Sequence, residues 1–105
     1  MKKYSDIEIQ TAIKTLNNWI LNEDKIEKQF QFKDFSEALT FIVRIGVLAE
    51  KQNHHPELYN VYNKVKVALT THDVSGLSDK DFLLDFLIPF LCGPDLQCIN
   101  ILQVQ

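Results

Sequence analysis

The sequence predicts one α+β domain with the element order α-β-β-α-β-β-α, in which a four-stranded antiparallel sheet carries its helices on one face. The chain has 105 residues, which is about the size of one domain. Two alternating segments follow the first helical segment and two more follow the second, and each pair is joined by a short turn. Short turns favour antiparallel pairing, so each pair of segments is expected to form a hairpin.

The N-terminal third predicts a helix followed by a hairpin. Ser5 or Asp6 can cap the helix, and Asn17-Asn18 is expected to end it. Its apolar positions follow helical spacing: Ile9, Ala12, Ile13 and Leu16. Residues 19–21 predict a short strand, residues 22–24 a turn, and residues 26–32 a second strand whose alternation only Lys28 interrupts.

A second helix is expected from a cap at Asp34 or Ser36 to about Gln52. It carries apolar residues on nearly all sides, and only one narrow face is consistently polar. A helix of this kind is usually buried on more than one side. Two interpretations stay open: packing within the monomer alone, or a subunit interface on one side of the helix.

The second hairpin is expected over residues 58–62 and 64–71, with its turn near Asn63. A last helix follows. Ser78 is its expected N-cap, and Asp81 stands at the third helical position, a conservative form of the capping box.

Composition narrows the classes of function. Eleven basic residues against 14 acidic ones give a formal charge of −3, which argues against direct nucleic-acid binding. The N-terminus carries no secretory signal, and Cys92 and Cys98 are too few for a disulfide framework, so a reduced, cytoplasmic setting is expected. The C-terminal stretch is apolar, but Asp85 and Pro89 interrupt it, so no membrane span is predicted.

Histidines are the candidate chemical groups. His54-His55-Pro56 lies between the second helix and the third strand, and His72 ends the fourth strand. A side chain with an ordinary pKa of about 6.5 suits proton transfer near neutrality. Two alternatives to a catalytic role stay open. His54 and His55 could be solvated loop residues, or all three histidines could form a zinc site. Zinc is less favoured, because adjacent side chains in an extended segment point to opposite faces.

The motifs together strengthen the catalytic interpretation. Glu50 precedes His54-His55-Pro56, Thr71-His72-Asp73 follows with His72 18 positions after His54, and Gly76-Leu77 and Asp81 come next. This constellation closely resembles the pterin-4a-carbinolamine dehydratase family, and the resemblance covers about residues 9–85.

The resemblance implies an enzyme that dehydrates 4a-hydroxytetrahydropterin to quinonoid dihydropterin, in tetrahydrobiopterin recycling. It implies general acid–base catalysis with no cofactor and no metal. By the same match, the family's active-site histidines correspond to His54, His55 and His72, and the substrate-contacting segments to Pro56, Thr71 and Asp73. Glu50 or Asp81 could hold an imidazole in the required tautomer, or could serve only as helix-end residues.

The resemblance also bears on partners. Family members form dimers or tetramers, so a homodimer or homotetramer is expected alongside the small-molecule pterin substrate. Animal relatives act as dimerisation cofactors of a transcription factor, and this protein-binding role is the alternative function. It would place a eukaryotic family member in the nucleus as well as the cytoplasm. No membrane partner is expected.

The C-terminal end departs from the family pattern. Leu84-Asp85 replaces the usual Leu-Ala pair, and Pro89 should kink or end the last helix. The expected division is therefore a dehydratase-like domain over residues 1–86 and an atypical apolar tail over residues 87–105. This tail is expected to pack on the domain or at an interface.

Overall fold

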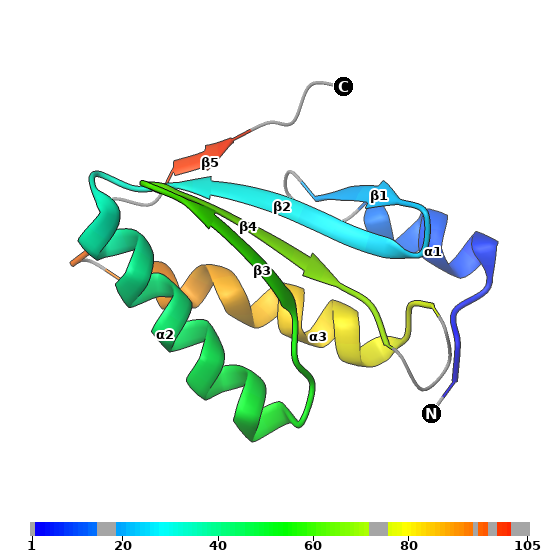
Figure 1. Ribbon diagram of the computed structural model, residues 1–105. Coiled ribbons are helices and arrows are strands. Elements are labelled where there is room, and N and C mark those ends of the chain that lie inside the picture. Colours follow the sequence, from blue (N-terminus) through cyan, green and yellow to red (C-terminus); the bar gives the residue numbers. More distant parts are fainter. Residues whose placement is uncertain (1, 15–18, 72–75, 94, 97–98, 102–105) are drawn as a thin grey trace.

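The structure is a computed structural model that describes residues 2–14, 19–71, 76–93, 95–96 and 99–101. Along the chain, its elements confirm the predicted order α-β-β-α-β-β-α and add two short elements at the C-terminal end (Figure 1). The elements are α1 (Asp6–Ile13), β1 (Ile20–Asn22), β2 (Lys25–Gln31), α2 (Phe35–Gln52), β3 (Glu57–Val61), β4 (Lys64–Leu69), α3 (Asp79–Leu87), the 3-10 helix η2 (Ile88–Cys92) and β5 (Ile99–Ile101).

The sheet is antiparallel with the strand order β1-β2-β4-β3, so the four predicted strands form two hairpins joined through β2 and β4. Ile26 pairs with Leu69 and Phe30 with Val65 at that central junction. A fifth strand was not predicted: β5 pairs with the end of β2, where Gln31 lies opposite Ile99. Its pairing with β2 depends on where the chain returns after the turn that begins at Gly93, which no local pattern in the sequence contains.

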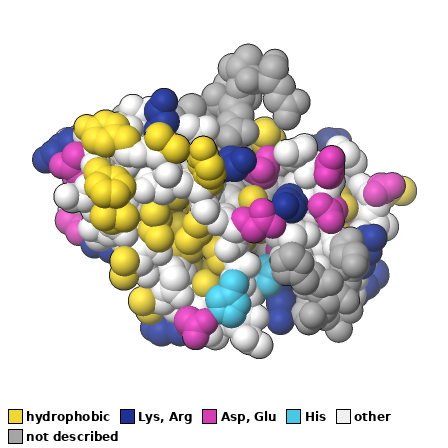
Figure 2. All heavy atoms as spheres, viewed as in Figure 1, with side chains coloured by type: hydrophobic (Ala, Val, Ile, Leu, Met, Phe, Trp, Pro, Cys, Tyr) yellow, Lys and Arg dark blue, Asp and Glu magenta, His cyan; other side chains and the backbone are white. Residues whose placement is uncertain are grey.

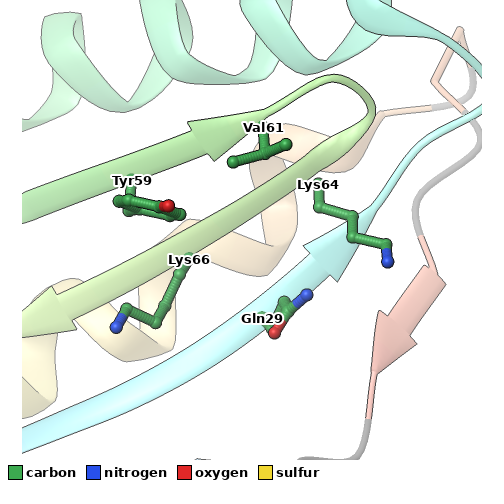
Figure 3. A pocket seen from close by; sticks show the side chains of 5 residues that line it. All are labelled: Gln29, Tyr59, Val61, Lys64 and Lys66. Atoms are coloured by element: carbon green, nitrogen blue, oxygen red, sulfur yellow. The ribbon is translucent and has the colours of Figure 1, made fainter.

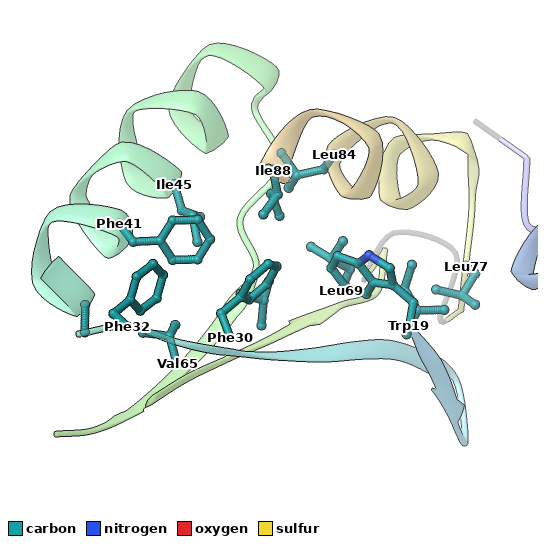
Figure 4. Close-up of a cluster of buried hydrophobic side chains, with 13 residues drawn as sticks. Trp19, Phe30, Phe32, Phe41, Ile45, Val65, Leu69, Leu77, Leu84 and Ile88 are labelled. Carbon is teal, nitrogen blue, oxygen red and sulfur yellow. The ribbon is translucent and has the colours of Figure 1, made fainter. Parts of the chain in front are cut away.

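The hydrophobic core lies between this sheet and helices α2 and α3, which both pack on one face (Figure 4). The ring centroids of Phe30 and Phe41 are 4.8 Å apart, so β2 and α2 meet through aromatic side chains. Lys28 keeps the inward register of β2 although it interrupts the sequence pattern. It is 1% exposed, and its ammonium lies 5.1 Å from the centroid of the Phe30 ring, a cation–π contact.

The helix boundaries follow the predicted signals. Ser5 caps α1 and Asp34 caps α2, each accepting a hydrogen bond from a backbone N–H in the first turn. The predicted end of α1 at residues 17–18 lies outside the described residues. Helix α3 ends at Leu87, and Pro89 stands in the first turn of η2, as expected for a residue that cannot continue an α-helix. No helix among the described ranges is long and apolar enough to cross a membrane.

Helix α2 has two apolar faces with different surroundings. Its inner face is buried in the core: Ala38, Phe41, Ile45 and Ala49. Its outer face carries the residues that we name the α2 stripe, which are 42–64% exposed: Phe35, Leu39, Val43 and Val47. Figure 2 shows hydrophobic side chains gathered over this helix. Packing within the monomer therefore explains one apolar face of α2, and the subunit interface stays a prediction.

The tail is attached to α2 and to β2. The Arg44 guanidinium donates to the Leu91 carbonyl at 2.9 Å and pairs with the Asp95 carboxylate at 2.5 Å. This ion pair raises the pKa of Arg44 and lowers the pKa of Asp95. The division of the chain at residue 86 stays a prediction.

Cys92 differs from the sequence expectation of reduced cysteines, because it is disulfide-bonded. The chain holds one other cysteine, Cys98, which lies outside the described residues. A turn closed by the hydrogen bond from Leu96 N–H to Gly93 O follows Cys92.

Among the described residues no helix packs on the opposite face of the sheet, and a hollow of about 440 Å³ lies there (Figure 3). Side chains from β2, β3 and β4 line the hollow: Gln29, Tyr59, Val61, Lys64 and Lys66. None of them is a predicted site residue, so the candidate active site is built below from the contacts of the histidines.

Candidate active site

The C-terminus of α2 sets the direction of the two adjacent histidines. Asn53 ends the helix in the left-handed region, with φ 49° and ψ 43°, a conformation that asparagine tolerates better than most residues. The N–H of Asn53 donates to Glu50 O at 3.2 Å, and the N–H of His54 donates to Ala49 O at 3.1 Å. These bonds satisfy two carbonyls of the last helical turn and turn the chain sharply just before His54.

His54 is directed inward. It is 8% exposed, and its Nε2 lies 2.6 Å from Asp81 Oδ1. Asp81 is completely buried in the first turn of α3, so this contact joins the end of one helix to the start of another. A buried carboxylate against an imidazole is a strong, charge-assisted partner.

Asp81 also has the capping role that its position predicts. Its Oδ2 accepts a hydrogen bond from the Ser78 backbone N–H at 3.0 Å, which completes the capping box of α3. The same oxygen accepts from the Thr71 hydroxyl at 2.6 Å. Asp81 therefore makes both contacts that its position allowed: it caps α3, and it contacts the His54 ring.

His55 is directed outward. Its Nε2 lies 2.5 Å from Glu50 Oε1, and both side chains are mostly exposed. Figure 2 shows the described histidines (cyan) together on one face of the molecule. The adjacent histidines thus have matched carboxylate partners in opposite environments, one buried and one in solvent.

The second histidine motif is described only in part. An isolated antiparallel bridge joins Thr71 to Gly76, with Thr71 N–H donating to Gly76 O at 2.7 Å. His72 and Asp73 fall within residues 72–75, outside the described residues, so their proximity to His54 is not described. Pro56 is half-buried directly after the histidine pair.

Ser78 is a member of this cluster that the sequence predicts only as a helix cap. Its hydroxyl lies 2.7 Å from the Thr71 hydroxyl, and it is completely buried. The sequence predicts the capping role of Ser78 but not its contact with Thr71, because nothing in the residue spacing shows that Thr71 reaches the Asp81 carboxylate. Among the residues that the structure describes, no group of three potential ligands is placed to hold a metal ion.

Comparisons with known proteins agree with the motifs. A family model described as pterin 4 alpha carbinolamine dehydratase matches residues 2–85. A Synechococcus protein named as a pterin-4-alpha-carbinolamine dehydratase is 47% identical over 85 residues, which cover 81% of this chain and 91% of that protein. A Burkholderia ambifaria protein with the same name is 40% identical over 93 residues, or 87% of this chain and 91% of its own length.

A solved structure shares the fold. The crystal structure of a Brucella melitensis protein, titled a transcriptional coactivator/pterin dehydratase, superimposes with a TM-score of 0.82 at 33% identity. The match covers 88% of this chain and all of that chain. By its sequence and its fold, this chain belongs to the pterin 4 alpha carbinolamine dehydratase family.

Proposed function

We propose that this chain dehydrates a 4a-hydroxytetrahydropterin to quinonoid dihydropterin and water through general acid–base catalysis by His54, His55 and His72. Membership of the family makes the protein a dehydratase, a hydro-lyase. The observation that carries the proposed mechanism is the pair of His–carboxylate contacts, His54–Asp81 and His55–Glu50.

The reaction needs two proton movements. A 4a-carbinolamine carries a hydroxyl on C4a and a hydrogen on the neighbouring N5. Loss of water requires a proton delivered to the departing hydroxyl and a proton removed from N5, and the two bonds broken leave a C4a–N5 double bond. Imidazole side chains can carry both protons near neutral pH.

His54 and His72 are the proposed proton carriers. The buried Asp81 carboxylate orients the His54 ring and stabilises the positive charge that forms when the ring takes up a proton. His55 is proposed to orient the pterin and to assist, with Glu50 holding its ring from the solvent side. Pro56, Thr71 and Asp73 remain proposed substrate-contacting positions.

A stopped-flow dehydration assay on freshly generated 4a-hydroxytetrahydropterin tests the proposal. The variants His54→Ala and His72→Ala should each lose about 10²- to 10⁴-fold in rate, the usual contribution of a general acid or base. Lys51→Ala, an exposed residue of the last α2 turn, is the matched control and should keep the wild-type rate. Wild-type rates in both histidine variants would contradict the assignment, and loss of activity with a chelator would point to a metal instead.

The second candidate function is protein binding, and the α2 stripe supports it. Four exposed apolar side chains on one helix form the kind of surface that subunits or partner proteins cover. We propose a homodimer or homotetramer assembled through this stripe, in the cytoplasm. The Brucella relative is titled a transcriptional coactivator as well as a dehydratase, so a transcription-factor partner is proposed only by analogy.

A further inference from the structure

The buried hydroxyls behind His54 have a defined order of donors. Thr71 has one hydroxyl proton, and it donates that proton to Asp81 Oδ2 at 2.6 Å. The 2.7 Å contact between the Thr71 and Ser78 hydroxyls must therefore be donated by Ser78. Ser78 Oγ in turn accepts from the Lys80 backbone N–H at 3.3 Å. Every donor in this chain of hydrogen bonds points toward Asp81.

This order determines the protonation of the His54 ring. The Asp81 carboxylate accepts at Oδ2 from Thr71 and from the Ser78 backbone, so these two donors hold it as an ionised acceptor. An ionised carboxylate can only accept, and therefore the 2.6 Å contact at Oδ1 requires a hydrogen on His54 Nε2. In the neutral ring the proton-free nitrogen is then Nδ1.

We infer that Thr71 and Ser78 are positioning residues, whose hydroxyls act through Asp81 to hold His54 as the Nε2–H tautomer and leave Nδ1 to exchange protons with the substrate. The tautomer part of this inference stands on the hydrogen bonds alone, and its link to turnover rests on the proposed function. It gives Ser78 a role beyond its helix cap. It also assigns the Thr71 hydroxyl to Asp81, so that the proposed contact of Thr71 with the substrate does not depend on this hydroxyl.

Loss of the Thr71 hydroxyl is expected to change the tautomer of the His54 ring more than it changes substrate binding. Without the Thr71 hydroxyl, Asp81 Oδ2 loses a donor and Ser78 loses its acceptor, so the carboxylate is held less firmly. The His54 ring can then sample both neutral tautomers, and Nδ1 is proton-free for only part of the time. We expect kcat to fall about tenfold, which is less than the 10²- to 10⁴-fold loss of a whole general acid or base because His54 itself is still present, while KM changes little.

The test compares Thr71→Val, Thr71→Ser and Thr70→Val in the full chain. Valine keeps the shape of threonine without the hydroxyl, and serine restores the hydroxyl. Thr70 is the matched control, because it is also buried but its single hydroxyl proton is shared between the backbone oxygens of Asp24 at 2.9 Å and Gly76 at 3.2 Å. Nitrogen-15 chemical shifts of the His54 ring, recorded at a pH where it is neutral, report the tautomer, and stopped-flow assays report kcat and KM.

We expect a single Nε2–H tautomer in the wild-type chain, in Thr71→Ser and in Thr70→Val, and a mixture in Thr71→Val with the loss in kcat. An unchanged tautomer and kcat in Thr71→Val would overturn the inference. Equal losses in Thr71→Val and Thr71→Ser would overturn it too, because the cause would then be packing. A rise in KM at constant kcat would instead show substrate contact by Thr71. If the wild-type chain lacks dehydratase activity, the proposed function fails, and the ring shifts still decide the tautomer.

Discussion

His54 Nε2 and Asp81 Oδ1 lie 2.6 Å apart across 27 residues of sequence, and they join the C-terminus of α2 to the first turn of α3. Asp81 is the third helical residue of α3 and closes its capping box. The start of α3 and the orientation of the inner histidine therefore depend on one side chain. Changes that disturb this helix terminus are expected to disturb the candidate active site as well.

Asp81→Asn should lower both activity and stability. Asparagine has nearly the same shape, but it is neutral and presents an NH2 group to one of its three buried donors. We expect at least a hundredfold loss in kcat and a loss of roughly 1–3 kcal/mol in the free energy of unfolding. Asp79→Asn, an exposed acidic residue of the same helical turn, is the matched control. Stopped-flow kinetics and urea unfolding measure the two effects, and equal results for both variants would contradict the role of Asp81.

Glu50→Gln should affect activity without affecting stability. The His55–Glu50 pair is mostly exposed, so water competes with the contact and the folded state gains little from it. Glutamine keeps one oxygen for the ring but removes the charge. We expect the free energy of unfolding to stay within about 0.5 kcal/mol of wild type, because exposed ion pairs contribute little. The dehydration rate should fall by less than in Asp81→Asn, and a larger fall would show that the outer pair is the more important one.

Much of the fold follows from local signals in the sequence. Ser5, Asp34 and Ser78 each cap the helix that their positions predict, and the two hairpins turn where the alternation breaks. These features depend on neighbouring residues alone. Strand β5 does not, because its pairing with β2 depends on where the tail returns after the turn that begins at Gly93.

The candidate site is predictable in its residues but not in its contacts. The motifs identify His54, His55, Glu50 and Asp81 through family resemblance, and helical spacing explains why Glu50 can reach the residues just past the helix end. The convergence of Thr71 and Ser78 on Asp81 is different. It requires the segment just after β4 to lie against the start of α3, a tertiary arrangement that no local pattern contains.

Acid should release the tail from α2. The hydrogen bond from Arg44 lowers the pKa of Asp95, so the folded chain binds this proton less readily than the unfolded chain does. The pair therefore contributes fully above the ordinary aspartate pKa of about 3.9, and its contribution is lost as pH falls through the lower folded value. Hydrogen exchange of the β5 amides measures the effect. Their protection should decrease below about pH 4 in the wild-type chain, and Asp95→Asn should show the lower protection already at neutral pH. Equal protection in both chains at neutral pH would show that the ion pair does not hold the tail.

Charging the α2 stripe should separate the subunits of the proposed oligomer. Val43 and Val47 are 64% and 54% exposed in the isolated chain, one helical turn apart on the same face. The double variant Val43→Lys/Val47→Lys places two like charges where an apolar interface would desolvate them, and this cost opposes association. Sedimentation should therefore give a dimer or tetramer for the wild-type chain and a monomer for the double variant. Ile7→Lys is the matched control, since this α1 side chain is 79% exposed and lies outside the stripe, and it should leave the assembly intact. A wild-type chain that remains monomeric at high concentration, or a double variant that keeps the wild-type mass, would rule out the α2 stripe as the subunit interface.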